Sequence, residues 1–178
     1  MLFRSYINIK RQYLTIGVNG LVEAAEYLGI EISDNSSYKS FVADVLGLIE
    51  SYNHKYRNEE LMFNCEMIPA ENVGVKHAKW DKRDGYKSNR DCYNSYFFIV
   101  EDESINILDK IRLHGRDYIQ HLTGGSALHL NLDEHLSESQ YRQLLRIAAI
   151  ECWNYLTFNI PNTVCNDCNH IDKRHLAI

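Results

Sequence analysis

The sequence predicts an α/β fold with a largely parallel sheet. About five short runs rich in β-branched and aromatic residues alternate with stretches of helical periodicity. Strands separated by helices are typical of β–α crossovers, which connect parallel strands. An open sheet and a section of a barrel would both show this pattern, so the periodicity alone leaves the two alternatives open.

The first half of the chain supplies two of the strands. Residues 12–18 form a Thr-, Ile- and Val-rich strand, and Asn19-Gly20 then turns into a helix that Gly29 ends as a C-cap. Residues 34–37 supply N-cap chemistry for a longer helix. The apolar stripe of that helix is expected at Phe41, Val45, Leu48, Ile49 and Tyr52.

The segments that follow are shorter. Residues 61–68 are the second strand, Pro69 closes it, and residues 70–78 form a short helix before the charged loop 80–90. A third strand is predicted at 96–100 from its aromatic and β-branched residues. We expect a helix over 104–120, with its inward face formed by Ile107, Leu108, Ile111, Tyr118 and Ile119.

The last third repeats the alternation. Gly124-Gly125 precedes a strand at 126–132, and Ser137 caps a further helix. A final strand at 155–160 runs into a turn that holds two cysteines. The buried stripe of the helix is expected at Tyr141, Leu144, Leu145, Ala148 and Cys152.

Composition restricts the class of protein. The chain has 178 residues with a formal net charge of -5, which favours neither nucleic acid nor an anionic membrane as a partner. No apolar run approaches the roughly 20 residues that a bilayer span requires. The amino terminus is too polar for a signal peptide, and five irregularly spaced cysteines fit a reduced, cytoplasmic chain. We expect one main domain over residues 1–160, and residues 161–178 should be the first part of a metal-binding segment.

The junction after the second strand is a candidate binding site. Pro69, Ala70, Glu71 and Asn72 combine a proline suited to a first helical position with exposed helix amides that attract anions. Ligands of parallel α/β folds bind at the carboxyl ends of strands. The residues support two interpretations: a phosphate or polar-substrate loop, and a capped helix whose dipole Glu71 complements.

The other potentially reactive side chains are expected to have mainly structural roles. Cys65 and Cys92 are expected to be inert core residues, not nucleophiles, and Cys152 falls on the helix stripe and should be core as well. His129 alternates with apolar neighbours, which favours a hydrogen-bonded core histidine over a metal ligand. Gly124-Gly125 indicates a turn or the close approach of a ligand.

Cys165 and Cys168 are the strongest chemical signal, because a Cys-x-x-Cys turn provides two of the four ligands of a structural zinc site. His170 and His175 are the further candidates nearby. Residues 169–174 are typical of the second strand of a ribbon, so half of a zinc ribbon is favoured. A thioredoxin-like redox pair and two ordinary thiols are the alternatives.

Several of these segments resemble, in order, the C-terminal part of the anaerobic (class III) ribonucleoside-triphosphate reductases, phage-like members especially. They include the paired glycines and the Cys-x-x-Cys turn. The matching segments are residues 15–21, 66–72 with 78–81, 90–95, 121–126 and 165–168.

The resemblance implies the later strands and helices of a ten-stranded α/β barrel of the glycyl-radical reductase type, ending in half a zinc ribbon. It also implies reduction of ribonucleoside triphosphates to deoxyribonucleotides for DNA replication. The resemblance further implies a radical-SAM activating enzyme as a partner and a homodimeric assembly, as in the full-length members of the family. Pro69, Ala70, Glu71 and Asn72 would bind substrate phosphates, and Cys165 and Cys168 would be the first half of a four-cysteine zinc site.

The sequence also departs from the family pattern. The second zinc cysteine pair, the glycyl-radical segment and the radical cysteine are not in these 178 residues. We therefore expect no catalytic residue in this chain, and turnover only together with complementary reductase segments. A non-catalytic nucleotide-binding or assembly remnant and a small zinc or thiol protein are the alternatives.

Overall fold

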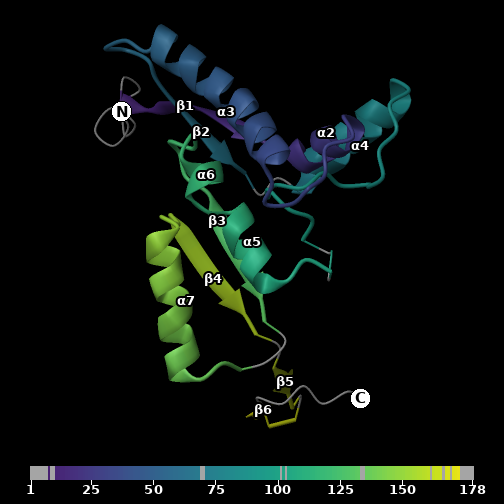
Figure 1. Ribbon diagram of the computed structural model, residues 1–178, viewed down its shortest axis with the longest axis vertical. Helices are drawn as coiled ribbons and strands as arrows, with labels where there is room; N and C mark the ends of the chain where they lie inside the picture. The colour runs from purple at the N-terminus through teal and green to yellow at the C-terminus, as the bar shows by residue number, and fades with distance from the viewer. Residues whose placement is uncertain are drawn as a thin grey trace.

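Four strands run parallel in the order in which they occur along the chain (Figure 1). The strands are β1 (Tyr13–Val18), β2 (Met62–Met67), β3 (Ala127–Asn131) and β4 (Tyr155–Asn159). β1 pairs with β2 and β3 pairs with β4, and a single parallel bridge between Glu66 and Gly125 joins the two pairs. The prediction of parallel strands is confirmed.

The computed structural model describes residues 8, 11–68, 71–100, 102, 104–132, 135–160, 162–165, 167–168 and 170–172. Its helices are α2 (Leu21–Tyr27), α3 (Ser36–Tyr56), α4 (Glu71–Arg83), α5 (Ile107–Leu113), α6 (Arg116–Ile119) and α7 (Glu138–Ile150). A short antiparallel pair follows, β5 (Thr163–Val164) with β6 (Ile171–Asp172). Within this described part, no helix is long and apolar enough to cross a membrane.

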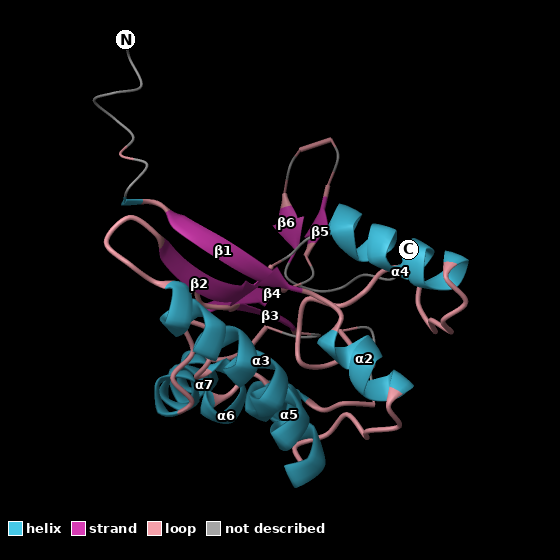
Figure 2. Cartoon of the chain, turned by 90° about the horizontal axis from the view of Figure 1, so that it is seen from above, coloured by secondary structure: helices cyan, strands magenta, loops and turns pink. Residues whose placement is uncertain are grey.

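Helices α3, α5, α6 and α7 lie on one face of the sheet (Figure 2). Alternation along the two central strands buries one set of side chains on this face, Cys65 and Met67 in β2 and Leu128 and Leu130 in β3. The opposite face carries polar side chains. They are Asn64 and Glu66 from β2, His129 and Asn131 from β3, and Asn159 from β4.

Aromatic rings fill the core beneath the helices. Tyr38 of α3 lies 5.8 Å from Tyr118 of α6 between ring centroids, and Phe97 lies 5.6 Å from Tyr118. The Tyr38 hydroxyl donates to the carbonyl of Phe97 at 2.8 Å. A buried hydroxyl with this partner fixes segment 96–98 against α3, which explains why these aromatic residues are buried without joining the sheet.

Segment 96–100 is therefore not the strand that was predicted. It is an irregular loop, and its aromatic composition reflects burial of Phe97 and Phe98 instead of ladder pairing. The predicted helix over 104–120 is divided into α5 and α6, with Gly115 in extended conformation as the N-cap of α6. α4 continues to Arg83, five residues past its predicted end at 78.

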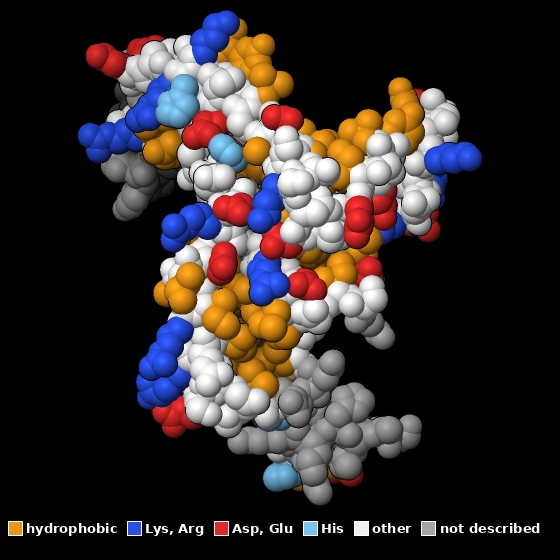
Figure 3. All heavy atoms as spheres, viewed as in Figure 1, with side chains coloured by type: hydrophobic (Ala, Val, Ile, Leu, Met, Phe, Trp, Pro, Cys, Tyr) orange, Lys and Arg blue, Asp and Glu red, His pale blue; other side chains and the backbone are white. Residues whose placement is uncertain are grey.

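Several predicted inward residues lie on the surface. α3 buries Tyr38, Val42, Leu46 and Asn53, a face rotated from the predicted stripe, so that Leu48 and Tyr52 are exposed. Leu108 and Leu145 are exposed as well, and Figure 3 shows hydrophobic side chains on the surface of the part formed by α5 and α7.

The predicted N-caps are confirmed: Asn35 caps α3, and Ser137 forms a capping box with Gln140.

The predictions that Cys152 and His129 are core residues are wrong. Cys152 is exposed at φ 60°, because α7 ends at Ile150 and the chain reverses there. His129 lies on the exposed face of β3, with its ring 6.4 Å from Tyr96 and 6.5 Å from Tyr155. Among the histidines that the structure describes, the buried one is His114, at the carboxyl end of α5.

Burial of His114 should make stability depend on pH. Loss of hydration lowers the pKa of His114 to about 4, and the backbone of Ser126 opposes this only in part. Between pH 4 and 6.5 the unfolded chain therefore binds more protons at this residue, so stability falls as the pH falls through this window. Between pH 7 and 4, His114 should account for a loss of up to about 3 kcal/mol in the free energy of unfolding.

Urea denaturation across this pH range will test the expectation. His114→Phe should remove this component of the pH dependence, whereas His129→Phe, at an exposed position, should keep it. Equal pH dependence in the wild type and His114→Phe would contradict the assignment.

Candidate functional site

The amino terminus of α4 lies at the carboxyl ends of β1 and β2. The two strands end together, with Val18 opposite Met67, and α4 begins at Glu71. The first amides of a helix have no intrahelical acceptor, so this edge of the sheet presents N–H donors and a positive dipole end. Asn72 is exposed in the first turn, while Pro69 and Ala70 lie outside the described residues.

A close backbone contact holds α4 against segment 92–93. The amide of Tyr93 donates to the carbonyl of Gly74 at 3.3 Å. A Cβ atom at Gly74 would lie 2.8 Å from the Tyr93 carbonyl oxygen and 3.1 Å from Cys92 Sγ. Only glycine fits this position without movement of the backbone, so Gly74 sets the distance between the helix and the segment.

A buried carboxylate fixes the next residues to α2. Glu23 is only 8% exposed, and it accepts hydrogen bonds from the Asn94 amide at 3.1 Å and from Asn94 Nδ2 at 2.7 Å. Arg90 Nη1 lies 3.6 Å from Glu23 and also pairs with Glu26, to which its Nη2 donates at 2.8 Å. This network satisfies a buried charge, as burial of a carboxylate requires.

The turn after β1 joins the same assembly. Gly20, at φ 85°, donates its amide to the Asn94 carbonyl at 2.8 Å, and Asn19 Nδ2 donates to the Tyr93 carbonyl at 3.4 Å. Segments 19–23, 74–81 and 90–94, which are distant in sequence, thus surround one edge of the sheet. The network of Glu23, Arg90 and Asn94 was not predicted. Arg90 and Asn94 lay in a recognised segment, but no periodicity signals a partner 71 positions away.

The predicted glycine turn makes the contact between the two strand pairs. The Gly124 amide donates to the Cys65 carbonyl at 2.8 Å, and the Cys65 amide donates to Thr123 Oγ1 at 3.2 Å. A Cβ atom at Gly124 would lie 2.9 Å from Asn64 Nδ2 and 3.0 Å from Glu66 Oε2. The paired glycines therefore form a turn that packs closely against β2.

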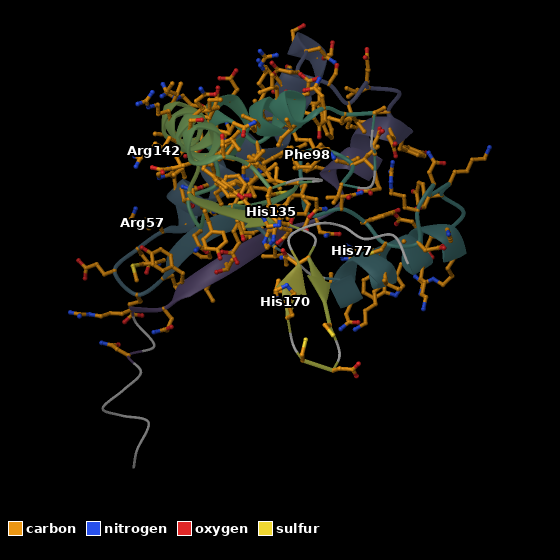
Figure 4. The ribbon with its side chains drawn as sticks, turned by 90° about the horizontal axis from the view of Figure 1, so that it is seen from below. Arg57, His77, Phe98, His135, Arg142 and His170 are labelled. Carbon is orange, nitrogen blue, oxygen red and sulfur yellow. The ribbon has the colours of Figure 1, made fainter. Side chains whose placement is uncertain are left out.

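The two turn cysteines lie on the β5–β6 hairpin, which projects from the sheet and carries His170 (Figure 4). The amide of Cys165 donates to the His170 carbonyl at 2.9 Å, and both thiols are exposed. Hydrogen bonds from the backbone of Cys168 and Asp167 lower the pKa of Cys165, which favours the thiolate that zinc requires. Among the described side chains, no group of three or more metal-ligating residues occurs. The cysteines present thus fit half of a tetrahedral site.

The other cysteines do not form a reactive centre. Cys65 is buried on the helix-facing side of β2, and desolvation raises the pKa of its thiol to about 11. Its predicted inert character agrees with this environment. Cys92 is exposed on the segment that follows α4, so the prediction that it is a core residue is wrong. Cys152 is exposed on the segment that follows α7.

Parallel strands in sequential order, with helix amides at their carboxyl ends, define an α/β protein with the geometry of an anion-binding edge. A model of the family "Anaerobic ribonucleoside-triphosphate reductase" matches residues 4–177. No curated protein matches the chain. The chain belongs to the anaerobic ribonucleoside-triphosphate reductase family.

Solved structures of similar proteins agree with this membership. An anaerobic ribonucleotide reductase is 30% identical with a TM-score of 0.80, over 93% of this chain and 27% of that one. The reductase of Thermotoga maritima, crystallised with MES in the active site, is 30% identical with a TM-score of 0.77, over 90% and 28% of the two chains. The same reductase with glycerol in the active site gives a TM-score of 0.78. The chain spans about a quarter of the length of these relatives.

The contact at Gly74 should be sensitive to one methyl group. Gly74→Ala should lower the free energy of unfolding by about 1–3 kcal/mol, because the added Cβ meets the Tyr93 carbonyl. Gly47→Ala is the matched control in α3, where nothing lies within 4 Å of an added Cβ. It should stabilise the chain by about 0.5–1 kcal/mol. Urea denaturation of both variants provides the measurement, and similar effects of the two would contradict the proposed role of Gly74.

Proposed function

We propose that this chain is the segment of an anaerobic ribonucleotide reductase that binds the phosphates of a ribonucleoside triphosphate. The observation that carries the proposal is the amino terminus of α4 at the shared carboxyl end of β1 and β2, in a member of this family. Pro69, Ala70, Glu71 and Asn72 are the proposed phosphate-binding residues. The main contribution would come from the backbone N–H groups of Ala70, Glu71 and Asn72 and from the helix dipole, which act on an anion irrespective of its base. Pro69 has no N–H group and would contribute by its position at the start of the helix.

The sheet supports a section of a barrel better than an open sheet. Strand order follows chain order, and α3, α5, α6 and α7 lie on one face of the sheet, as helices do on the outside of a barrel wall. The polar face with Asn64, Glu66, His129 and Asn159 would then line the interior. We propose residues 1–160 as this partial barrel and 161–178 as the start of the zinc-binding segment.

The radical chemistry would come from reductase segments outside these 178 residues. A glycyl radical, installed by a radical-SAM activating enzyme, would supply the radical that initiates hydrogen abstraction from the ribose. This chain's contribution would be to bind and orient the triphosphate, without a catalytic residue of its own. The segment would act within the dimeric assembly of its family.

Cys165 and Cys168 are proposed to provide two of four zinc ligands, with the other two from a complementary segment. Support comes from their position on one tight hairpin and from the lowered pKa of Cys165. When bound, zinc would link this hairpin to that segment and hold the carboxyl-terminal part in place. A non-catalytic remnant that keeps nucleotide affinity would use the same α4 terminus, and only turnover with complementary segments and activase separates these possibilities.

A charge change at Asn72 tests phosphate binding. Asn72→Asp should weaken binding of a ribonucleoside triphosphate roughly tenfold, since a carboxylate beside the phosphates repels them. An Asp in the first turn favours the helix, so weaker binding cannot be attributed to loss of α4. Isothermal titration calorimetry at low salt gives the affinity.

Gln143→Glu is the control, because it makes the same charge change on the exposed side of α7. Its affinity for the triphosphate should equal that of the wild type. The proposal fails if neither variant differs from the wild type, or if both weaken binding equally.

Cobalt substitution tests the thiolate pair. Addition of Co²⁺ should produce thiolate-to-metal charge-transfer absorption in the wild type, and the variant Cys165→Ser/Cys168→Ser should lose it. The matched variant Cys92→Ser/Cys152→Ser removes two other exposed thiols and should retain the absorption. Equal loss in the two variants would argue against the hairpin as the metal site.

A further inference from the structure

A cleft of about 930 Å³ lies between α2, α4 and the segment that follows α4. Its walls come from Tyr27 of α2, His77 and Trp80 of α4, and Tyr86 of the following loop, with Asn19 and Glu23 at the side nearest the sheet. Hydrophobic side chains gather over α2 and α4 on the surface shown in Figure 3. Asn72 is not among the described residues that line this cleft.

The cleft presents aromatic faces at more than one side. The rings of Tyr27 and Tyr86 lie 5.8 Å apart at 73°, and those of His77 and Trp80 lie 5.6 Å apart at 45°. Trp80 is 49% exposed and Tyr86 is 54% exposed. Exposed rings around a concavity suit a flat apolar ligand, because stacking covers both the ring faces and the ligand.

Asn19 provides the cleft with a hydrogen-bond acceptor. Asn19 Nδ2 donates a hydrogen bond to the Tyr93 carbonyl. Its Oδ1 is buried and has no partner among the described residues. A buried acceptor of this kind favours a ligand that donates an N–H group. Asn19 therefore requires that a ligand held between the aromatic walls also carry an N–H donor.

The charges of the lining disfavour phosphates. Glu23, Glu26 and Asp81 contribute carboxylates, and Lys87 is the lysine of the lining. Arg90 pairs with both glutamates, and the Tyr93 hydroxyl donates to Asp81. With three carboxylates and these cations, the cleft has no positive excess that would retain a triphosphate.

We propose that this cleft binds an uncharged or cationic amino-substituted heteroaromatic ring of the nucleobase or nucleoside type. The ring stacks against Trp80 and Tyr86, and its exocyclic amino group donates to Asn19 Oδ1. His77 follows Asn72 by five residues, which places the cleft about 8 Å further along the axis of α4 than the phosphate-binding turn. The two sites favour opposite charges, so the inference goes beyond the proposed function and can fail independently of it.

Adenosine is the probe for this site. Trp153→Phe leaves Trp80 as the sole tryptophan, and saturable quenching of its fluorescence by adenosine is the expected result. ATP should bind more weakly at this site, which is the reverse of the preference expected at the α4 terminus. Purine riboside, which lacks the amino group, should bind about tenfold more weakly than adenosine.

Isothermal titration calorimetry with the full chain tests whether adenosine binds at the walls of the cleft and not elsewhere on the surface. Tyr86→Ala should weaken adenosine binding about tenfold or more, the magnitude expected for loss of one stacking ring. Tyr52→Ala removes an equally exposed tyrosine from α3, outside the cleft, and should leave the affinity unchanged. Absence of saturable adenosine binding, tighter binding of ATP to Trp80, or equal effects of the two tyrosine variants would each overturn the proposal.

Discussion

The contact between β2 and the Gly124–Gly125 turn holds together two pairs of strands that otherwise form separate sheets. It consists of one parallel bridge, one backbone hydrogen bond and one hydroxyl contact, between residues 64–66 and 123–125. A side chain at Gly124 would displace Asn64 and Glu66. The parallel alignment of all four strands, and with it the common edge at which helices begin, depends on this close approach.

Hydrogen bonds from irregular segments then complete that edge. Segment 90–94 has no regular secondary structure, yet Glu23 and Glu26 of α2 hold it by charged hydrogen bonds and Gly74 of α4 admits it at van der Waals distance. Because both ends of this arrangement are anchored, the segment can connect the first turns of α2 and α4 in a fixed geometry. Both the proposed phosphate-binding turn and the aromatic cleft rely on it.

Local patterns in the sequence were sufficient for elements whose burial follows their own periodicity. Runs of β-branched and aromatic residues placed β1 through β4, and the side chains of Asn35 and Ser137 indicated where α3 and α7 begin. The errors occurred where distant residues decide the conformation. Phe97 and Phe98 resemble a strand but pack under α3, and Glu151 lies against Gly115, where the predicted long helix is broken. The junction at 69–72 was recognisable because proline and helix amides are local signals. The aromatic cleft was not recognisable, because its walls come from segments brought together only by the fold.

The pairing of strands across helices has a consequence for the order of folding. Partners in β1 and β2 are 49 positions apart, as Tyr13 and Met62 illustrate, whereas Ala127 and Tyr155 of β3 and β4 are 28 positions apart. Closing the longer loop costs about 0.5 kcal/mol more in chain entropy. The capping box of α7 also favours early helix formation within the shorter unit. We therefore expect β3, α7 and β4 to assemble first and to present Gly124–Gly125 as the template on which β2, and then β1, align.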